Sequence, residues 1–100
     1  MKIMISQPMR GKTEEQIRNE REDLIKQLEA EGHEVIDTIF TNVNPGIGNI
    51  DLAMYYLSMS IEAMSKVDGV VFLNGWEAAR GCRIENQIAK EYGKFIKYIN

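Results

Sequence analysis

Side chains that could bind a ligand or react with it gather in two short stretches of this 100-residue chain. Residues 6–11 read Ser-Gln-Pro-Met-Arg-Gly, and residues 74–85 read Asn-Gly-Trp-Glu-Ala-Ala-Arg-Gly-Cys-Arg-Ile-Glu. Each stretch leads from a short apolar run into a helical pattern. Both therefore end at a helix N-terminus, where free amides and the helix dipole favour an anion.

Four cations lie in or directly after these stretches of a chain whose net charge is −3: Arg10, Lys12, Arg80 and Arg83. Positive charge beside helix N-termini is typical of a phosphate or carboxylate site. The alternative is that these are loop charges that contact only solvent. We favour the anion site because the charges and the helix ends coincide.

Glu85 and Trp76 have both a chemical and a structural interpretation. Glu85 falls in the first turn of a helical pattern, where a carboxylate could act as a nucleophile or a general base. The alternative is an acidic residue favoured there by the helix dipole alone. Trp76 either offers a stacking surface to an aromatic ligand or closes the core or a subunit contact.

The elements that must position these residues alternate along the chain. Apolar runs predict strands at residues 2–6, 33–37, 69–73 and 95–99. A capping box at Thr13 predicts a helix that ends at Gly32, with its Glu, Arg and Lys residues pointing away from the core. Further helices are predicted at residues 51–66, capped by Asp51, and at residues 81–92. Residues 38–50 and 74–80 are expected to be loops, the first of them a cover over the site or a disordered connection.

This order predicts an α/β fold, namely a flavodoxin-like three-layer sandwich with a four-stranded parallel sheet in the order 2-1-3-4. Residues 1–100 are expected to form a single domain. Ligands bind such sheets outside the carboxyl ends of the strands, at the point where the strand order reverses. The stretches after the first and third predicted strands should meet there.

The amino-acid composition argues against a membrane, a metal ion and a nucleic acid as binding partners. No apolar run approaches the ~20 residues that a membrane-spanning helix needs, and the N-terminal residues lack the apolar segment of a signal peptide. A single cysteine, Cys82, fits a reducing cytoplasm. One His and one Cys make a zinc site improbable, and the acidic balance argues against a nucleic-acid polymer. We expect a cytoplasmic protein that acts on a small molecule without a metal or other cofactor.

The pairing of the two stretches resembles a family of small phage and bacterial proteins of unassigned function, over essentially the whole chain. That family is similar to the nucleoside 2-deoxyribosyltransferase superfamily, which includes the 2′-deoxynucleoside 5′-phosphate N-hydrolases. The resemblance implies that residues 1–100 are a single nucleoside 2-deoxyribosyltransferase-like domain. Its partner would be a small-molecule nucleoside or nucleotide.

The resemblance also implies roles for individual residues. Glu85 would be the catalytic residue, whose carboxylate attacks C1′ of the deoxyribose and displaces the base, and Gly81 matches a glycine of the same motif. Arg10 and Gly11 match the segment that holds the 5′-phosphate in the hydrolases. The expected substrate-binding residues are Ser6, Gln7, Met9, Arg10, Gly11, Asn74, Gly75, Trp76, Arg80, Gly81 and Arg83.

The chain departs from these enzymes at several positions. Ser60 stands where they carry a sugar-binding Asp, Arg83 replaces a glycine, Met4 replaces a Tyr and Pro8 replaces a serine. The missing Asp bears on turnover more than on binding. Two functions therefore stay open: cleavage or transfer of an N-glycosidic bond, and non-catalytic capture or sensing of a nucleotide-like ligand. Arg83 is expected either to keep Glu85 ionised or to form an ion pair with it.

The predicted helix at residues 51–66 carries apolar side chains beyond a single face. A small domain offers little depth in which to bury them all. We therefore expect a homodimer or a higher homo-oligomer in which this helix is shared between subunits. A purely structural interaction module is a third interpretation, in which Glu85 and Trp76 have no chemical role.

Overall fold

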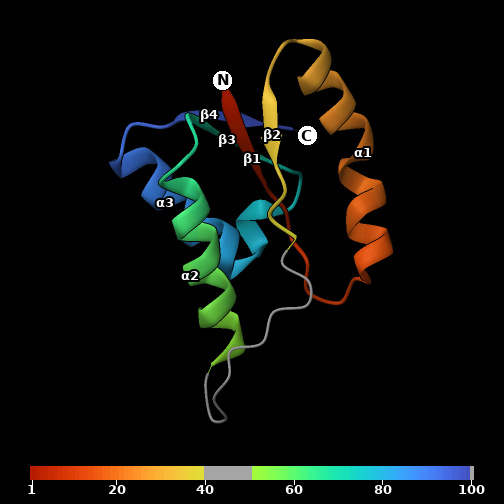
Figure 1. Cartoon of the computed structure of the whole chain (residues 1–100). Coiled ribbons are helices and arrows are strands. Elements are labelled where there is room, and N and C mark those ends of the chain that lie inside the picture. Colours follow the sequence, from red (N-terminus) through yellow and green to blue (C-terminus); the bar gives the residue numbers. More distant parts are fainter. Residues whose placement is uncertain (40–50, 100) are drawn as a thin grey trace.

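A computed structural model describes residues 1–39 and 51–99, which form a three-layer α/β sandwich (Figure 1). Four strands make one sheet in the order β2-β1-β3-β4, and every neighbouring pair is parallel. The strands are β1 (Lys2–Ser6), β2 (Glu34–Ile36), β3 (Gly69–Phe72) and β4 (Phe95–Tyr98). The helices are α1 (Glu14–Ala30), α2 (Leu52–Met64) and α3 (Arg80–Glu91). The predicted flavodoxin-like class and strand order are confirmed.

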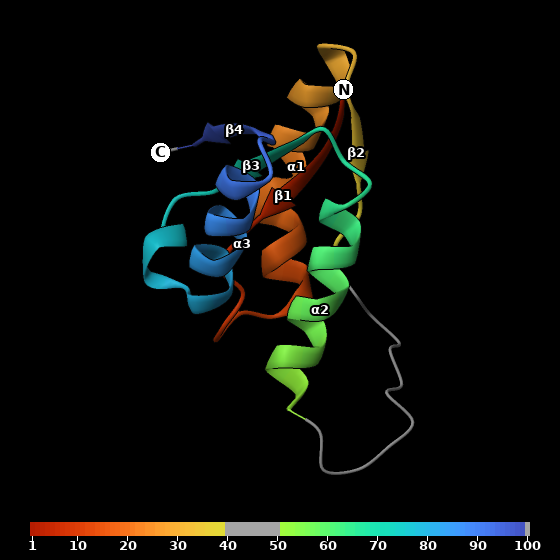
Figure 2. The ribbon, with the colours of Figure 1, turned by 90° about the vertical axis from the view of Figure 1, so that its left-hand side faces the viewer.

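Alternation along the strands divides the core into two layers. One face of the sheet packs on α1, and the other packs on α2 and α3, which lie in front of the sheet in Figure 2. The cluster on the α1 side contains Ile3, Ile5, Leu24, Leu28 and Val71. The opposite cluster contains Met4, Met64, Val67, Val70, Phe72 and Ala89. Because β1 and β3 contribute to both clusters, they are the central strands of the sheet, which the continuous apolar run of β3 predicted for that strand.

Local sequence sets the helix boundaries. The Thr13 hydroxyl accepts a hydrogen bond from the Gln16 amide at 3.1 Å, and the Gln16 side chain accepts one from the Thr13 amide at 2.9 Å. This is the predicted capping box. Asp51 caps α2 by accepting from the Met54 amide at 3.1 Å. Gly32 follows α1 with a φ of 92°, a left-handed conformation that glycine adopts without strain.

Some predicted boundaries were wrong by a few residues. Residues 74–80 are not entirely loop, because they contain a short 3₁₀ helix, η1 (Trp76–Ala78), that follows Gly75. The helix α3 begins at Arg80, and β2 is shorter than residues 33–37. The predicted cover at residues 38–50 lies outside the described residues except for Thr38 and Ile39. Within the described ranges, no helix is long and apolar enough to cross a membrane.

Candidate functional site

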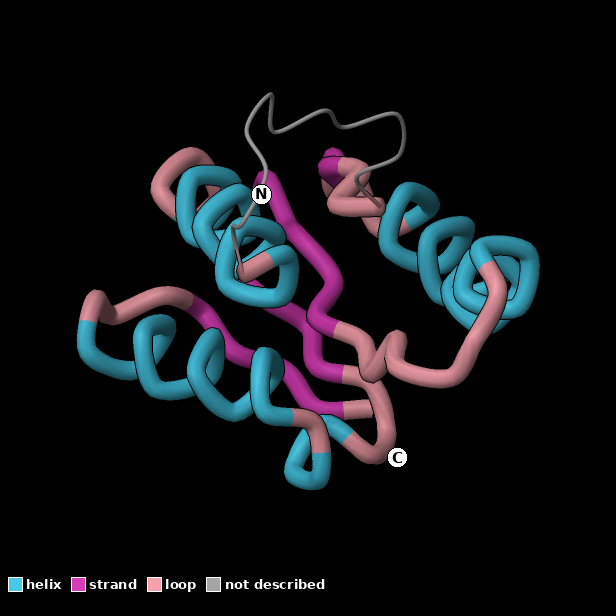
Figure 3. Tube along the Cα trace, turned by 90° about the horizontal axis from the view of Figure 1, so that it is seen from below, coloured by secondary structure: helices cyan, strands magenta, loops and turns pink. Residues whose placement is uncertain are grey.

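An open cleft of about 1350 Å³ lies at the carboxyl ends of β1 and β3. Figure 3 shows this edge of the sheet from below, where the segments that follow these strands lie beside one another. The Leu73 amide donates to the Ser6 carbonyl at 3.0 Å, so the two segments start side by side. The cleft therefore occupies the point where the strand order reverses, which is the usual ligand position in such sheets.

The cleft brings together most of the residues that sequence analysis singled out. Its floor and rim are formed by the segment after β1, by the start of α3 and by one side of α2. The expected site residues that line it are Ser6, Gln7, Met9, Arg10, Gly75, Arg80, Gly81, Arg83 and Glu85. Ser60 also lines the cleft, together with Ala53, Tyr56 and Leu57 of the same helix.

Gly11, Asn74 and Trp76 are not among the residues that line the cleft. The Trp76 ring stacks on Tyr98 with ring centroids 5.3 Å apart and contacts Phe72 at 5.5 Å. It also packs against the core cluster on the α3 side of the sheet. In this structure the indole contributes to closing the core, as its structural interpretation proposed, and it does not line the cleft.

Glu85 is a buried acid at the floor of the cleft, with 7% of its surface exposed. It lies on the core-facing side of α3 with Cys82 and Ala89, at a helical spacing where an apolar residue would pack. The Ser6 hydroxyl donates to Glu85 Oε2 at 3.3 Å. Burial raises the pKa of Glu85 to about 7, against the opposing effects of the Ser6 hydrogen bond and the Arg21 charge. Such a carboxyl exchanges its proton near neutral pH, which suits a nucleophile or a general base.

The cations at the cleft differ in their surroundings. Lys12 pairs with Glu20 at 2.8 Å. Arg83 donates to the Glu77 carbonyl at 3.1 Å and is exposed, so neither of its two expected relations with Glu85 is seen. Arg10 and Arg80 are exposed on the rim. The described residues contain no cluster of three His, Cys, Asp or Glu side chains that could hold a metal ion.

With this geometry established, comparison with known proteins gives one result. The model of a family described as a domain of unknown function, DUF4406, matches residues 1–98. The chain belongs to the DUF4406 family. No curated protein and no solved structure matches it. The family description names no activity, so the function of this DUF4406 domain has to be argued from the cleft itself.

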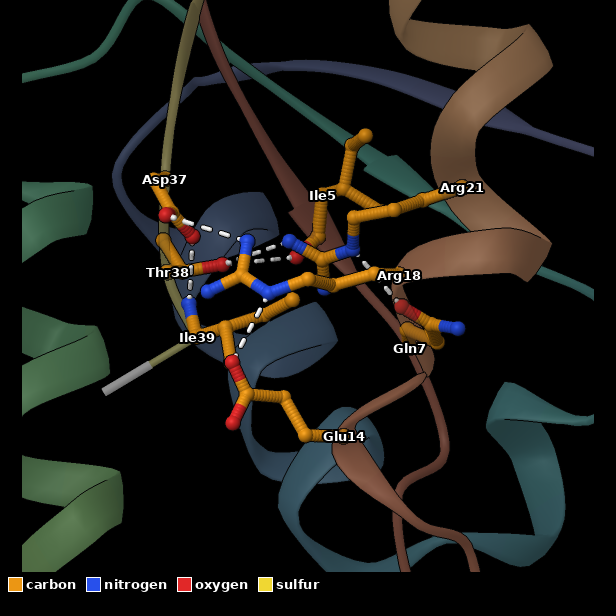
Figure 4. A network of polar contacts seen from close by, with 8 residues as sticks. All are labelled: Ile5, Gln7, Glu14, Arg18, Arg21, Asp37, Thr38 and Ile39. Carbon is orange, nitrogen blue, oxygen red and sulfur yellow. Dashed lines mark hydrogen bonds and ion pairs between the residues drawn. The ribbon is translucent and has the colours of Figure 1, made fainter. Parts of the chain in front are cut away.

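Arg21 is the polar residue that sequence analysis missed in this DUF4406 domain. It was expected to point away from the core, but it is buried with 2% of its surface exposed. Its Nε donates to Gln7 Oε1 at 2.8 Å and its Nη1 to Thr38 Oγ1 at 3.5 Å (Figure 4). The signal was present in the spacing, because Arg21 lies four residues after Ile17 and three before Leu24, on the buried face of α1.

Replacing Glu85 with Gln is expected to stabilise the DUF4406 domain at pH 8. The native pKa of about 7 exceeds the ordinary value of 4.5, so the native state keeps a proton that the unfolded chain releases between these pH values. Wild-type stability therefore falls as pH rises through this range. The Gln variant avoids this loss, which amounts to about 3 kcal/mol in the free energy of unfolding at pH 8.

Urea denaturation at pH 4 and pH 8 measures this effect. The matched control is Glu77→Gln, which removes an exposed carboxylate from the neighbouring 3₁₀ helix. This control should keep the wild-type difference in stability between the two pH values. Equal stability of the wild type and Glu85→Gln at pH 8 would show that the ionised Glu85 carboxylate does not lower the free energy of unfolding.

Proposed function

We propose that this protein binds a deoxynucleoside or its 5′-monophosphate in the cleft and cleaves or transfers its N-glycosidic bond. The observation that carries the proposal is Glu85, a buried carboxylate on the floor of an open cleft whose rim carries cations. A buried ionisable side chain at an apolar helix position has a stability cost, which a catalytic role would explain. The resemblance of both stretches to the deoxyribosyltransferase superfamily supports the same assignment.

The proposed reaction proceeds through a covalent intermediate. The Glu85 carboxylate forms a bond to C1′ of the sugar, and the bond from C1′ to the base nitrogen breaks with its electron pair leaving on the base. The base takes up a proton from solvent. Water or a second base then attacks C1′, loses a proton to solvent and releases the carboxylate. The Ser6 hydroxyl, which donates to Oε2 at 3.3 Å, orients the carboxylate for this attack.

Arg10 is the proposed anchor for the 5′-phosphate, with Lys12 close by on the same loop. The first turn of α1 is a less favourable phosphate site than its position suggests, since it carries Glu14 and Glu15 and its Gln16 amide is already capped. The start of α3 has no side-chain cap and no acidic residue in its first turn. Arg80 at this start is the alternative anchor.

A specific observation also favours the second candidate function, non-catalytic capture or sensing of a nucleotide-like ligand. The cleft-lining side chains of α2 are Ala53, Tyr56, Leu57 and Ser60. None of these four residues supplies the second carboxylate that the related enzymes place on this helix to bind or orient the sugar. A cleft without it could still bind a nucleotide.

Base release is the direct test of the catalytic proposal. Incubation of the protein with a panel of deoxynucleosides and their 5′-monophosphates is expected to liberate free base, measured by chromatography. Glu85→Gln should lower the rate by at least about a hundredfold, because the nucleophile is lost. The control Glu77→Gln should retain the wild-type rate. Equal rates in the wild type and Glu85→Gln would exclude Glu85 as the nucleophile, and tight binding without base release would favour capture.

A nucleoside monophosphate is expected to raise the melting temperature, because it binds only the native state. At a concentration about tenfold above its Kd the shift should be about 7 °C for a domain of this size. Arg10→Ala should remove most of this shift, and Lys26→Ala, which removes an exposed cation from α1, should not. A shift lost in Arg80→Ala but kept in Arg10→Ala would move the phosphate to the start of α3.

We also propose that the protein forms a homodimer through α2. Met64 is the buried residue of this helix, whereas Leu52, Met54, Tyr56 and Ile61 are 51%, 68%, 39% and 38% exposed. Pairing of two copies would cover these apolar side chains and bring the partner close to the cleft, which Tyr56 lines.

Light scattering at micromolar concentration should therefore give about twice the chain mass of 11.5 kDa. Met54→Lys should return the protein to the monomer, because a charge would be buried in the interface. The control Glu22→Lys, on the exposed side of α1, should leave the dimer intact. A wild-type mass of 11.5 kDa would exclude the shared helix.

A further inference from the structure

Two buried charges of opposite sign lie at the carboxyl end of β1. Among the charged side chains in residues 1–39 and 51–99, the buried ones are Arg21, 2% exposed, and Glu85, 7% exposed. They come from helices on opposite faces of the sheet. An isolated buried charge is strongly unfavourable, so each of these groups gains stability from the presence of the other.

Consecutive residues of β1 and its loop connect the two charges. Gln7 accepts a hydrogen bond from Arg21 Nε at 2.8 Å and donates to the Ile17 carbonyl at 3.0 Å. Ser6, directly before it, donates to Glu85 Oε2 at 3.3 Å. Arg21 and Glu85 are thus fixed to neighbouring positions of the same chain segment, and Ser6, Gln7 and Glu85 all line the cleft.

The charge of Arg21 is not neutralised by a direct ion pair with a carboxylate. Within the described residues it forms none, and its buried Nη2 has no hydrogen-bond partner there. Asp37 attracts the guanidinium, but Asp37 is exposed and is also paired with Arg18 at 3.5 Å. Arg18 in turn pairs with Glu14 at 2.9 Å (Figure 4). Arg21 itself does not line the cleft, and its positive charge reaches the cleft through Glu85, whose pKa it lowers.

The other groups that face Glu85 do not supply an equivalent charge. On α3 itself, burial raises the pKa of the Cys82 thiol, which leaves it neutral, and Arg80 and Arg83 are exposed. On the β1 side, Arg10 is exposed and Lys12 pairs with Glu20. The side chains of α2 that line the cleft carry no charge.

We propose that Arg21 is a positioning residue for Glu85: it fixes Gln7 in the wall of the cleft and supplies a buried positive charge that favours the ionised form of the Glu85 carboxylate. The catalytic value of this charge rests on the proposed function, whereas its effect on Glu85 does not. The charge of Arg21 lowers the pKa of Glu85 against the larger effect of burial. Without it, the carboxyl would hold its proton to higher pH and lose nucleophilicity at neutral pH.

Titration of the carboxyl carbon of Glu85 by NMR tests this charge without any substrate. The protein is labelled with ¹³C-carboxyl glutamate, and the Glu85 signal is assigned by its absence in Glu85→Gln. The wild type should titrate near pH 7. Arg21→Met should titrate higher, by on the order of one pH unit. Arg21→Lys, which keeps the charge, should restore most of the wild-type value.

Arg18→Met is the matched control, because it removes a cation one turn earlier on α1 that is exposed and already paired. It should leave the Glu85 titration unchanged. If Arg21→Met does not fold, Arg21→Gln carries the same comparison, since it removes the charge but keeps a hydrogen-bond donor towards Gln7. An unchanged Glu85 titration in the folded, uncharged variant would overturn the proposal.

Base release separates this proposal from the proposed function. Where the wild type is active, the alkaline shift of Arg21→Met should appear in its rate profile, with a rate about fivefold lower at pH 7 and close to the wild type at pH 9. A wild type that releases no base would refute the catalytic function alone, because the NMR titration would still report the charge on Glu85. If Arg21→Met shifts the titration of Glu85 but leaves the pH dependence of base release unchanged, the charge of Arg21 has no catalytic role.

Discussion

The strand β1 is paired on both edges and packed on both faces, and the rest of the structure depends on this arrangement. Parallel pairing with β2 and β3 fixes its register, and residues 3–6 are buried. Its carboxyl end therefore has little freedom to move. Ser6, which ends the strand, hydrogen-bonds the carboxyl of Glu85 from α3, and Gln7, directly after it, hydrogen-bonds the guanidinium of Arg21 from α1. The geometry of the cleft follows from this strand more than from its loops.

Much of this arrangement could be predicted from local sequence. The alternation of apolar runs with helical periods determines the sheet order, and the Thr13 capping box and Gly32 mark the ends of α1. The meeting of two loops at the reversal of strand order follows from topology alone. Glu85 could be proposed as a site residue because α3 begins at that edge, but the prediction that it lies in the first turn was wrong: the helix starts at Arg80, and Glu85 lies in the second turn.

Other features depend on contacts between residues distant in sequence, which periodicity does not encode. Trp76 in η1 stacks on Tyr98 of β4, so the aromatic residue with the clearest ligand-binding interpretation packs against the core. Arg21 was assigned to the exposed side because of its charge, although its spacing placed it on the buried face. Its partners Gln7 and Thr38 follow two different strands, and only the folded chain brings them together.

The hydrogen bonds of Gln7 have a consequence for the chemistry of the cleft. Its amide oxygen accepts from Arg21 and its amide nitrogen donates to the Ile17 carbonyl, so neither end can turn towards Glu85. Arg21 is thus hydrogen-bonded to a neutral side chain, and it influences Glu85 without forming a contact ion pair with it. A contact ion pair would leave the carboxylate neutralised and geometrically occupied. The hydrogen bonds of Gln7 hold Arg21 at the neighbouring chain position, while the hydrogen bond from Ser6 engages only Oε2 of Glu85.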